Sequence, residues 1–347
     1  MKFGHLAGPG RLEVVERPEP TAGPGEVVVA LAACGVCGTD LEKLKGNYRT
    51  AGVIGHEPVG RVAHLGEGVK GLSVGDRVFV HHHVPCYECE VCLRGDTTFC
   101  PTYSKTNLDP GGFAEAFRVP SENVSRGAIL SLDDSVDWST GALLEPAGCA
   151  MTALRRIGLP EGASVFVLGL GPVGLLYARL ARALGASWVG GTESAPRRRA
   201  AAERGGIDVT IDPRDPGAAK AAVDRATNGR GVDLAVVATG HPTVVRDATT
   251  LVRRGGTVNL FGLPDAGSRL DADLQDLYLR GVRLIPSYAT TEPDIEEVHR
   301  FIVDGELRVA DLVTHRLPLA RLDEAFRLAG SPAEAVKVIV TGPALNG

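Results

Sequence analysis

The sequence contains few aromatic residues, no long apolar run and little net charge. Aromatic side chains make up 5% of its 347 residues, and the formal net charge is -5. No segment approaches the roughly 18 uninterrupted apolar residues of a spanning helix, and residues 1–10 contain no apolar core of signal-peptide length. The only tight basic run is Arg197 to Arg199, which is too short for a polyanion footprint. We therefore expect a cytoplasmic protein with neither nucleic acid nor membrane as a partner.

The composition and length predict a globular protein of two domains. Hydrophobic residues make up 44% of the chain, with 44 glycines and 22 prolines that indicate many turns. Up to Val80, short β-branched runs alternate with Gly, Pro and Asp, which predicts a β-rich domain. Beyond Trp138 strands alternate with helices, so we expect a doubly wound parallel sheet. Its predicted strands are 164–168, 188–192, 209–211, 232–238, 257–261 and 282–285; helices 291–304 and 321–329 and a strand 336–340 follow.

Four of the seven cysteines lie close together in the sequence PCYECEVCLRGDTTFC. The spacing C-x2-C-x2-C-x7-C, formed by Cys86, Cys89, Cys92 and Cys100, suits four thiolates around a tetrahedral zinc ion with no open position. The pattern therefore predicts a structural zinc site. Four separate buried thiols or an iron-sulfur cluster are weaker alternatives, because the spacing is regular and matches no ferredoxin pattern. For the adjacent histidines 81–83 we expect a surface or packing role.

A second group of donors indicates a metal site with an open position. Cys37 lies in CGVCGTD, and His56 and Glu57 lie in GHEPVG. A thiolate, an imidazole and a carboxylate can hold zinc and leave one position for water or substrate. A lone histidine is more often a core residue, and Cys34 with Cys37 also has the spacing of a redox pair. We discount the redox interpretation because we expect this pair to precede a β-rich lobe instead of opening a helix in a thioredoxin-like unit.

A glycine-rich turn indicates a dinucleotide site. The motif GLGPVG follows the apolar strand SVFVL and opens an amphipathic helix, so its backbone can approach a pyrophosphate at the helix N-terminus. Glu193 follows at the distance where an acid meets the ribose hydroxyls of NAD. NAD is therefore favoured, although Thr192 and Arg197 to Arg199 leave NADP open because they can contact a 2'-phosphate. The residues expected to bind the coenzyme at this turn are Gly169, Gly171, Pro172, Val173 and Gly174.

Together these motifs resemble the zinc-dependent medium-chain dehydrogenases, the superfamily of alcohol, polyol, threonine and glucose dehydrogenases. CGVCGTD, GHE, GDRV, the cysteine cluster and LLEPAGCA occur in the family's order over essentially the whole chain. The resemblance implies an α/β fold with a GroES-like β-rich catalytic domain at 1–148, whose lobe at 86–100 holds the structural zinc. It further implies a Rossmann NAD(P)-binding domain at 149–286 and a return to the catalytic domain at 287–347.

The resemblance also implies a ligand set for the catalytic zinc. Cys37 and His56 correspond to zinc ligands, Glu57 is close enough to bind or exchange onto the metal, and Asp40 corresponds to the carboxylate that orients His56. The third ligand position falls on Glu145 in LLEP, where alcohol dehydrogenases use a cysteine. The alternative is Cys149, which shares a helix face with that position if the segment is helical.

The resemblance suggests the remaining roles. Thr39 corresponds to the proton acceptor, and Glu42 occupies the position where many members have a proton-relaying histidine, so we leave open whether Glu42 relays protons or is a surface charge. Arg198 corresponds to the residue at the adenine end of the coenzyme. We expect a homodimer or homotetramer.

The expected activity is hydride transfer between a nicotinamide coenzyme and a secondary alcohol or ketone, with the zinc between the domains as Lewis acid. We favour a polyol, sugar or cyclitol substrate because of the carboxylate ligand and of polar residues expected near the site, namely Asn47, Tyr48, Arg49, Lys105 and Asn107. A simple alcohol or a threonine-like amino alcohol is the alternative. A zinc-free quinone or enone reductase and a non-enzymatic zinc-binding protein are less favoured, because the zinc motifs and the dinucleotide motif occur together.

Overall fold

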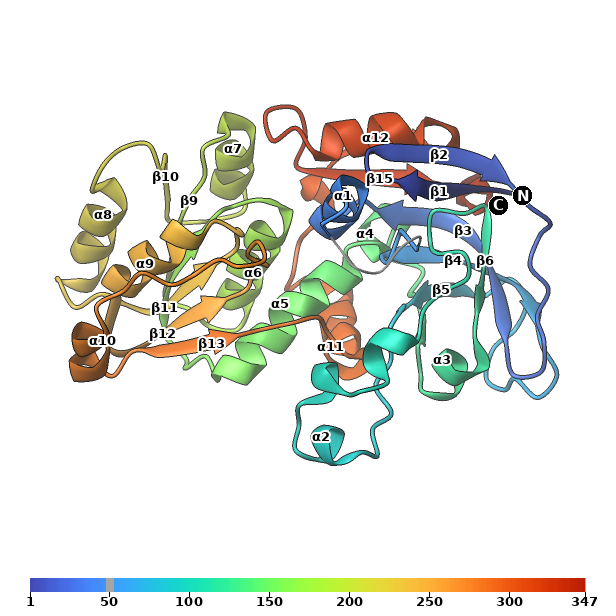
Figure 1. Cartoon of the computed structure of the whole chain (residues 1–347), viewed down its shortest axis with the longest axis horizontal. Helices are drawn as coiled ribbons and strands as arrows, with labels where there is room; N and C mark the ends of the chain where they lie inside the picture. Colours follow the sequence, from blue (N-terminus) through green and yellow to red (C-terminus); the bar gives the residue numbers. More distant parts are fainter. Residues whose placement is uncertain (48–52, 347) are drawn as a thin grey trace. The chain divides into compact units, whose positions relative to one another are not determined.

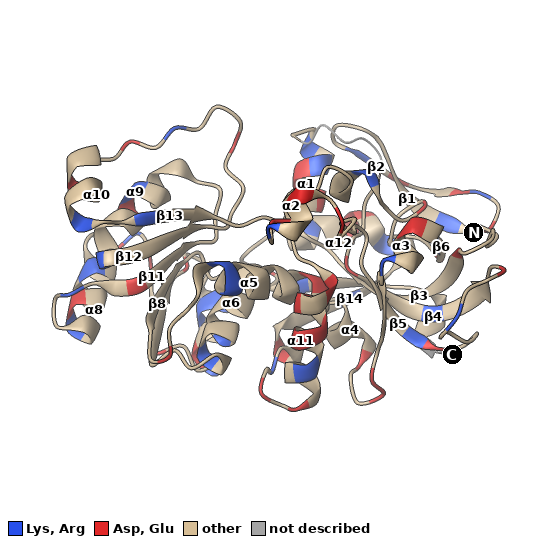
Figure 2. Ribbon diagram, turned by 90° about the horizontal axis from the view of Figure 1, so that it is seen from below, with Lys and Arg blue, Asp and Glu red and all other residues tan. Residues whose placement is uncertain are grey.

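The computed structural model describes residues 1–47 and 53–346, and the chain divides into two compact units (Figure 1). The first unit consists of residues 1–146, 290–305 and 309–347, and the second of residues 147–289 and 306–308. No described helix has the combined length and hydropathy that a membrane span requires. Lys and Arg are interspersed with Asp and Glu along the helices (Figure 2).

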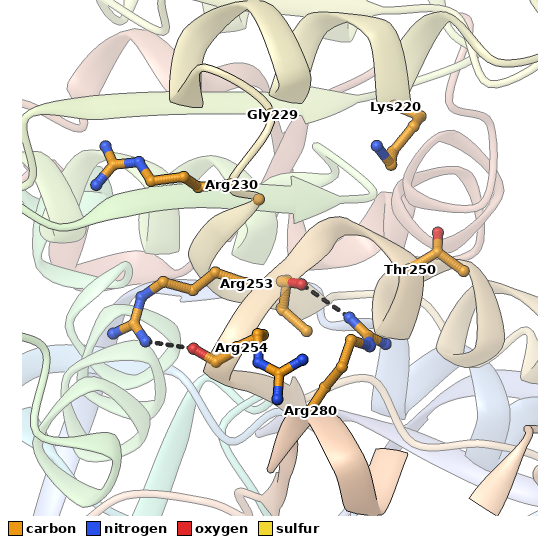
Figure 3. A pocket seen from close by; sticks show the side chains of 9 residues that line it. Lys220, Gly229, Arg230, Thr250, Arg253, Arg254 and Arg280 are labelled. Carbon is orange, nitrogen blue, oxygen red and sulfur yellow. Dashed lines mark hydrogen bonds between the residues drawn. The ribbon is translucent and has the colours of Figure 1, made fainter. Parts of the chain in front are cut away.

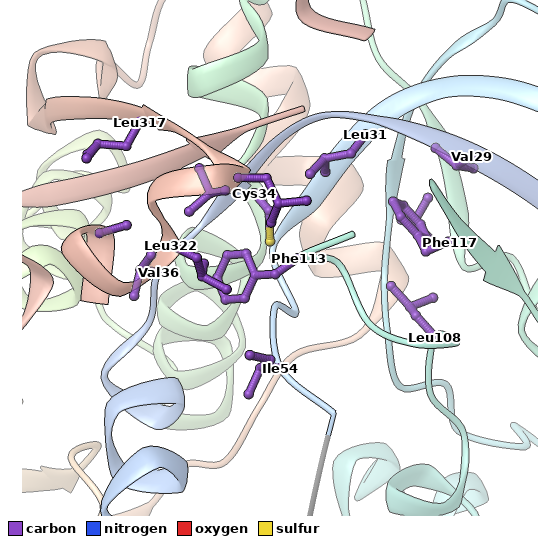
Figure 4. Close-up of a cluster of buried hydrophobic side chains, with 14 of the residues drawn as sticks. Val29, Leu31, Cys34, Val36, Ile54, Leu108, Phe113, Phe117, Leu317 and Leu322 are labelled. Atoms are coloured by element: carbon purple, nitrogen blue, oxygen red, sulfur yellow. The ribbon is translucent and has the colours of Figure 1, made fainter. Parts of the chain in front are cut away.

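The first unit is built around a mixed sheet and a hairpin. The hairpin pairs β1 (Lys2–Gly8) with β2 (Arg11–Glu16). The sheet contains, in order, β14 (Val313–Pro318), β15 (Lys337–Thr341), β3 (Val27–Gly35), β4 (Pro58–Leu65), β5 (Arg77–Val80) and β7 (Ile129–Ser131), and β6 (Ala116–Val119) also pairs with β3. Strand β3 has the sequence VVVALAACG and is buried over nearly its whole length, so its apolar run does not alternate. Figure 4 shows side chains from this strand and several loops packed in one apolar cluster.

Short helices join the strands of the first unit. They are α1 (Gly38–Lys45), α2 (Glu90–Leu93), η1 (Thr97–Phe99), η2 (Tyr103–Lys105), α3 (Ser121–Ser125), α4 (Trp138–Gly141), α11 (Glu292–Val303), η3 (Ala310–Leu312), η4 (Leu319–Arg321), α12 (Leu322–Ala329) and η5 (Pro343–Asn346). The longer helix α5 (Leu144–Ile157) begins in the first unit and continues into the second. The helices expected at 291–304 and 321–329 are thus present as α11 and α12.

The second unit is a six-stranded parallel sheet with helices packed against it. The strand order is β10 (Val209–Ile211), β9 (Trp188–Thr192), β8 (Ser164–Leu168), β11 (Val232–Val237), β12 (Val252–Leu260) and β13 (Arg283–Pro286). The helices are α6 (Pro172–Ala183), α7 (Pro196–Arg204), α8 (Ala218–Thr227), α9 (Pro242–Leu251) and α10 (Leu274–Arg280). The doubly wound sheet is therefore present. The prediction was wrong for the start of β12, because the polar, glycine-rich segment 253–256 indicates a turn although it belongs to the strand.

Candidate active site

The four cysteines of the predicted structural site converge. Their Sγ atoms lie 3.5 Å (Cys86 to Cys100), 3.6 Å (Cys89 to Cys92) and 3.9 Å (Cys86 to Cys92, Cys89 to Cys100) apart. A tetrahedron of sulfurs about 2.3 Å from zinc has edges of about 3.8 Å, so the spacing fits a zinc ion. Backbone N–H groups of Glu88 and Cys89 lower the pKa of the Cys86 thiol, whereas burial raises the pKa of the Cys92 thiol. The lobe therefore brings four sulfur atoms together at the spacing that a zinc ion requires.

The second predicted group also converges, at the ends of two neighbouring strands. Cys37 is the N-cap of α1, just beyond β3, and His56 and Glu57 immediately precede β4. Strands β3 and β4 are antiparallel, with Cys34 opposite Pro58. One ligand atom from each of Cys37, His56 and Glu57 lies within 4.8 Å of the other two. The donor set of one sulfur, one nitrogen and one oxygen is typical of zinc.

Asp40 contacts both Cys37 and His56 of this group of donors. Its carboxylate accepts the N–H of Cys37 at 3.1 Å and the N–H of Gly55 at 3.1 Å, and one of its oxygens lies 3.4 Å from Nδ1 of His56. This contact leaves the Nε2 atom of His56 for a metal. Burial alone would raise the pKa of Asp40, but His56 lowers it below its ordinary value. Asp40 is thus placed to orient the imidazole, as second-sphere carboxylates do.

A buried lysine that the sequence analysis missed contacts the same group. Strand β15 pairs with β3 so that Ile339 lies opposite Gly35, and continuing this register places Lys337 opposite Cys37. Lys337 Nζ donates to Glu57 Oε1 at 2.7 Å, and both side chains are almost fully buried. Burial alone would lower the pKa of Lys337, but Glu57 raises it. In the sequence, this lysine could have been noticed because it interrupts the apolar run AVKVIV.

The carboxylate of Glu57 packs against Gly35 and is paired with Lys337. A Cβ at Gly35 would lie 1.7 Å from Oε2 of Glu57, so only glycine leaves room for this side chain. This Oε2 is buried and lies 2.5 Å from Lys337 Nζ, so the ammonium contacts both oxygens of the carboxylate. A buried carboxylate beside a cysteine sulfur and an imidazole can serve as a ligand of a cation.

Glu145 and Cys149 lie on the same face of α5, one helical turn apart. Glu145 is buried and belongs to the first unit, whereas Cys149 belongs to the second. Glu145 is not among the three donors within 4.8 Å of one another, but its charge adds to the effect of burial in raising the pKa of Glu57. Glu145 therefore lies near the site, and its role as the third ligand stays a prediction.

The structure argues against the redox alternative for Cys34 and Cys37. Cys37 is the N-cap of α1 in the β-rich first unit. Cys34, however, lies inside the apolar cluster with Leu31 and Phe113 (Figure 4). Complete burial, followed by the charges of Glu57 and Asp40, raises its pKa well above the ordinary value of a thiol. A thiol held protonated in an apolar core is a poor nucleophile, so the pair does not suit thiol exchange.

The structure favours the surface interpretation of Glu42. One of its carboxylate oxygens accepts from Lys45 Nζ at 2.7 Å and the other from Asn47 Nδ2 at 2.6 Å. These hydrogen bonds lower its pKa below its ordinary value, so the side chain is committed to the end of α1. Thr39 is half-buried in the first turn of α1, and Tyr48 and Arg49 lie outside the described residues.

The three consecutive histidines after β5 differ in their surroundings. His81 Nδ1 lies 2.6 Å from Glu292 Oε1, and His83 Nδ1 bonds the carbonyl of Thr106. These two have the expected packing role. His82 instead has its ring 5.1 Å from the ring of His56. Burial, followed by the neighbouring histidines, lowers the pKa of His82 well below its ordinary value.

The glycine motif forms the turn between β8 and α6, as the sequence predicts. Gly169 has φ +101°, in the region that favours glycine. A Cβ at Gly174 would lie 2.0 Å from the carbonyl oxygen of Gly169, so glycine is needed for close packing of the helix against the strand. Pro172 occupies the first turn of α6, where its missing N–H costs nothing.

Glu193 and Arg198 face each other beside this turn. Glu193 directly follows β9, accepts the N–H of Ala195 at 2.9 Å and has its other oxygen 3.9 Å from Arg198 Nη1. Burial lowers the pKa of Arg198, against the effect of Glu193. The same Nη1 would lie 3.4 Å from a Cβ at Gly171, so the guanidinium lies over the glycine turn. Arg199 is bound to Asp212 and to backbone carbonyls.

A cavity of about 510 Å³ in the second unit is lined by none of these residues (Figure 3). It is lined by Lys220, Arg230, Arg253, Arg254 and Arg280. Three of these cations are neutralised at short range by Asp224, Asp233 and Asp276. The labelled arginines in Figure 3 extend in different directions instead of towards one point. The cavity is therefore not arranged as an anion site.

Two family descriptions match the chain: the alcohol dehydrogenase GroES-like domain at residues 23–128 and the zinc-binding dehydrogenase at residues 172–304. The chain belongs to the zinc-binding alcohol dehydrogenase family. This finding confirms the resemblance and the fold class of a GroES-like domain with a Rossmann domain. It also confirms the assignment to an enzyme class, the zinc-binding dehydrogenases.

Individual relatives resemble the chain over nearly its full length. It is 32% identical to L-threonine 3-dehydrogenase of Pyrococcus furiosus, covering 93% of this chain and 94% of that one. It is 30% identical to sorbitol dehydrogenase of Bacillus subtilis, with coverage of 98% and 97%. Among solved structures, a zinc-binding dehydrogenase of Sinorhizobium meliloti bound to NADP has 28% identity and a TM-score of 0.87, covering 98% of both chains.

Proposed function

We propose that the chain is an NAD(P)-dependent zinc dehydrogenase that oxidises a secondary alcohol of a polyol, sugar or cyclitol, or reduces the corresponding ketone. The observation that carries this proposal is the convergence of Cys37, His56 and Glu57 in a chain that also has a glycine turn between a parallel strand and a helix. The sorbitol dehydrogenase relative supports the polyol class, and the threonine dehydrogenase relative keeps an amino alcohol as the second candidate.

In this proposal Cys37, His56 and Glu145 hold the catalytic zinc, and Glu57 binds it or exchanges onto it. Zinc in such a site supplies a Lewis acid that lowers the pKa of a bound hydroxyl. Asp40 holds the His56 ring in the orientation and tautomer that a ligand requires. The Thr39 hydroxyl accepts the substrate proton, and Cys86, Cys89, Cys92 and Cys100 hold a structural zinc.

For the coenzyme, we propose that the turn at Gly169, Gly171, Pro172, Val173 and Gly174 binds the pyrophosphate of NAD at the N-terminus of α6. Glu193 binds the ribose hydroxyls, and its carboxylate disfavours a 2'-phosphate. Arg198 lies beside Glu193 and the glycine turn, and it binds the adenine end of the coenzyme. NAD is therefore the preferred coenzyme, and Arg198 provides the charge through which NADP can also be accepted.

We also propose that the protein acts in the cytoplasm as a homodimer or homotetramer. Strand β13 is an outer strand of the second unit's sheet, and the neighbouring helix α10 exposes Leu274, Tyr278 and Leu279 by 76%, 84% and 59%. An unpaired strand edge beside exposed apolar side chains is a common site of self-association. Light scattering of the purified protein tests this proposal.

A rate screen tests the activity. Purified protein is assayed with polyols, sugars, aminocyclitols, amino alcohols and simple alcohols, with NAD and NADP in turn, by nicotinamide absorbance. We expect turnover of polyhydroxylated secondary alcohols and a loss of turnover in Cys37→Ala with coenzyme binding retained. Full activity of Cys37→Ala, or of protein from which a chelator has removed all zinc, contradicts the proposal.

A further inference from the structure

His82 is brought to the catalytic group by strand register. Strands β4 and β5 are antiparallel, with Val59 opposite Phe79 and Gly60 opposite Val78. Continuing this register beyond the strands places His82 opposite His56. The ring distance of 5.1 Å agrees with this placement. His82 therefore lies next to a predicted zinc ligand although 26 residues separate them in the sequence.

The Nδ1 atom of His82 differs from the Nδ1 atoms of its two neighbours. His81 and His83 each use Nδ1 for a hydrogen bond within the first unit. The Nδ1 atom of His82 is buried and has no hydrogen-bond partner among the described residues. A buried polar atom without a partner is costly, and native structures rarely keep one unless water or a ligand satisfies it.

The unpartnered Nδ1 atom of His82 needs a donor or an acceptor, and the described side chains supply neither. A neutral imidazole has one donor and one acceptor, which matches a hydroxyl group. A simple secondary alcohol has no second hydroxyl for this purpose, whereas a vicinal diol has one beside the reacting carbon.

We propose that His82 binds the hydroxyl adjacent to the reacting carbon and thereby selects vicinal diols over simple secondary alcohols. This inference rests on the proposed function and specifies the substrate class of the same site. An imidazole that hydrogen-bonds a substrate hydroxyl discriminates strongly against substrates without that hydroxyl. When such a substrate is bound, the imidazole nitrogen stays unpaired.

The test compares 2,3-butanediol with 2-butanol, which differ by one hydroxyl. His82→Phe keeps a ring of similar size but removes both nitrogens, and His82→Gln restores a donor and an acceptor. Loss of one such hydrogen bond is expected to lower kcat/KM for the diol by about 10- to 100-fold. We expect less than about a threefold change for 2-butanol, and partial recovery for the diol in His82→Gln. His64→Phe, an exposed histidine in β4, is the matched control.

Each outcome has one meaning. Equal losses of kcat/KM for both alcohols in His82→Phe, or no loss for either, overturn the inference while the proposed function stands. A wild-type protein that is zinc-loaded but oxidises neither alcohol with either coenzyme, nor any polyol, overturns the proposed function and the inference with it. Zinc content and thermal unfolding are measured for each variant. Values close to those of the wild-type protein show that a loss of activity does not come from a loss of folding. If His82→Phe does not bind zinc, His82→Gln is compared with the wild-type protein in its place. His82→Gln must then retain the preference for the diol.

Discussion

Replacing Lys337 with Met should destabilise the metal-free protein far more than the zinc-loaded protein. Lys337 is 2% exposed and its partner Glu57 is fully buried, with 2.7 Å between Nζ and Oε1. Methionine keeps the approximate volume but leaves the carboxylate without its cation. Removing one partner of a buried ion pair typically costs about 3–5 kcal/mol. We therefore expect a loss of this size in the free energy of unfolding of the first unit.

Zinc changes the expected loss because it brings a second cation to Glu57. If zinc compensates the carboxylate, the loss caused by Lys337→Met is smaller with zinc bound. By linkage, the difference between the two losses equals the change in the free energy of zinc binding. A difference of about 2 kcal/mol corresponds to roughly 30-fold tighter zinc binding by the variant. In that case lysine competes with zinc for Glu57 in the wild-type protein.

Urea unfolding followed by fluorescence measures the first unit separately. The chain has two tryptophans, of which Trp138 lies in the first unit and Trp188 in the second. In a Trp188→Phe background the emission reports on Trp138 alone, and zinc affinity is measured by competition with a chelating dye. Lys70→Met, at an exposed lysine of the same unit, is the control and should change stability by less than about 0.5 kcal/mol.

Two results would refute this reasoning. Equal losses in the free energy of unfolding with and without zinc would mean that zinc does not compensate the charge of Glu57. A loss in metal-free Lys337→Met as small as in the Lys70→Met control would mean that the pair contributes nothing as an ion pair. The double variant Glu57→Gln with Lys337→Met should regain most of the lost stability, because no uncompensated charge is then buried.

Three further changes test the coenzyme turn, coenzyme choice and the cysteine lobe. Gly174→Ala should weaken NADH binding, measured by fluorescence titration, by more than about tenfold, because its Cβ would lie 2.0 Å from the Gly169 carbonyl oxygen; unchanged binding would contradict this. Glu193→Ser should raise the ratio of kcat/KM for NADP to that for NAD by about tenfold or more, because a carboxylate no longer repels the 2'-phosphate. Cys92→Ala should lower the zinc content measured by atomic emission from about two to about one per chain; a full complement would refute the ligand assignment.

Local sequence patterns predicted most of the fold. The six strands of the second unit are short apolar runs separated by amphipathic helices, so periodicity and turn residues locate them. The start of β12 was missed because Arg253 to Gly256 have the composition of a turn, and pairing with neighbouring strands overrides that local preference. Cys37, His56 and Glu57 were predicted because each lies in a short motif that marks its chemistry.

His82 and Lys337 were missed for a different reason. Neither lies in a motif, and both reach the site only through strand register, which pairs residues far apart in the sequence. Lys337 is 280 residues from Glu57. A single sequence does not reveal which strand pairs with which, so the position of a lone polar residue relative to the site is hidden from it. Once the registers of β15 with β3 and of β5 with β4 are known, both placements follow.

The pairing of β3 explains why these residues meet. Near its carboxyl end, Cys34 lies opposite both Pro58 of β4 and Val340 of β15, so β3 is the shared neighbour of the two strands. On its other side β4 pairs with β5, with Val59 opposite Phe79, and the continuation of that pairing places His82 opposite His56. Because side chains alternate between the faces of a strand, a shift of any one pairing by a single residue would remove its polar group from the site. The apolar core around β3 therefore has a functional role, since the packing that fixes these registers also fixes the positions of the donor atoms.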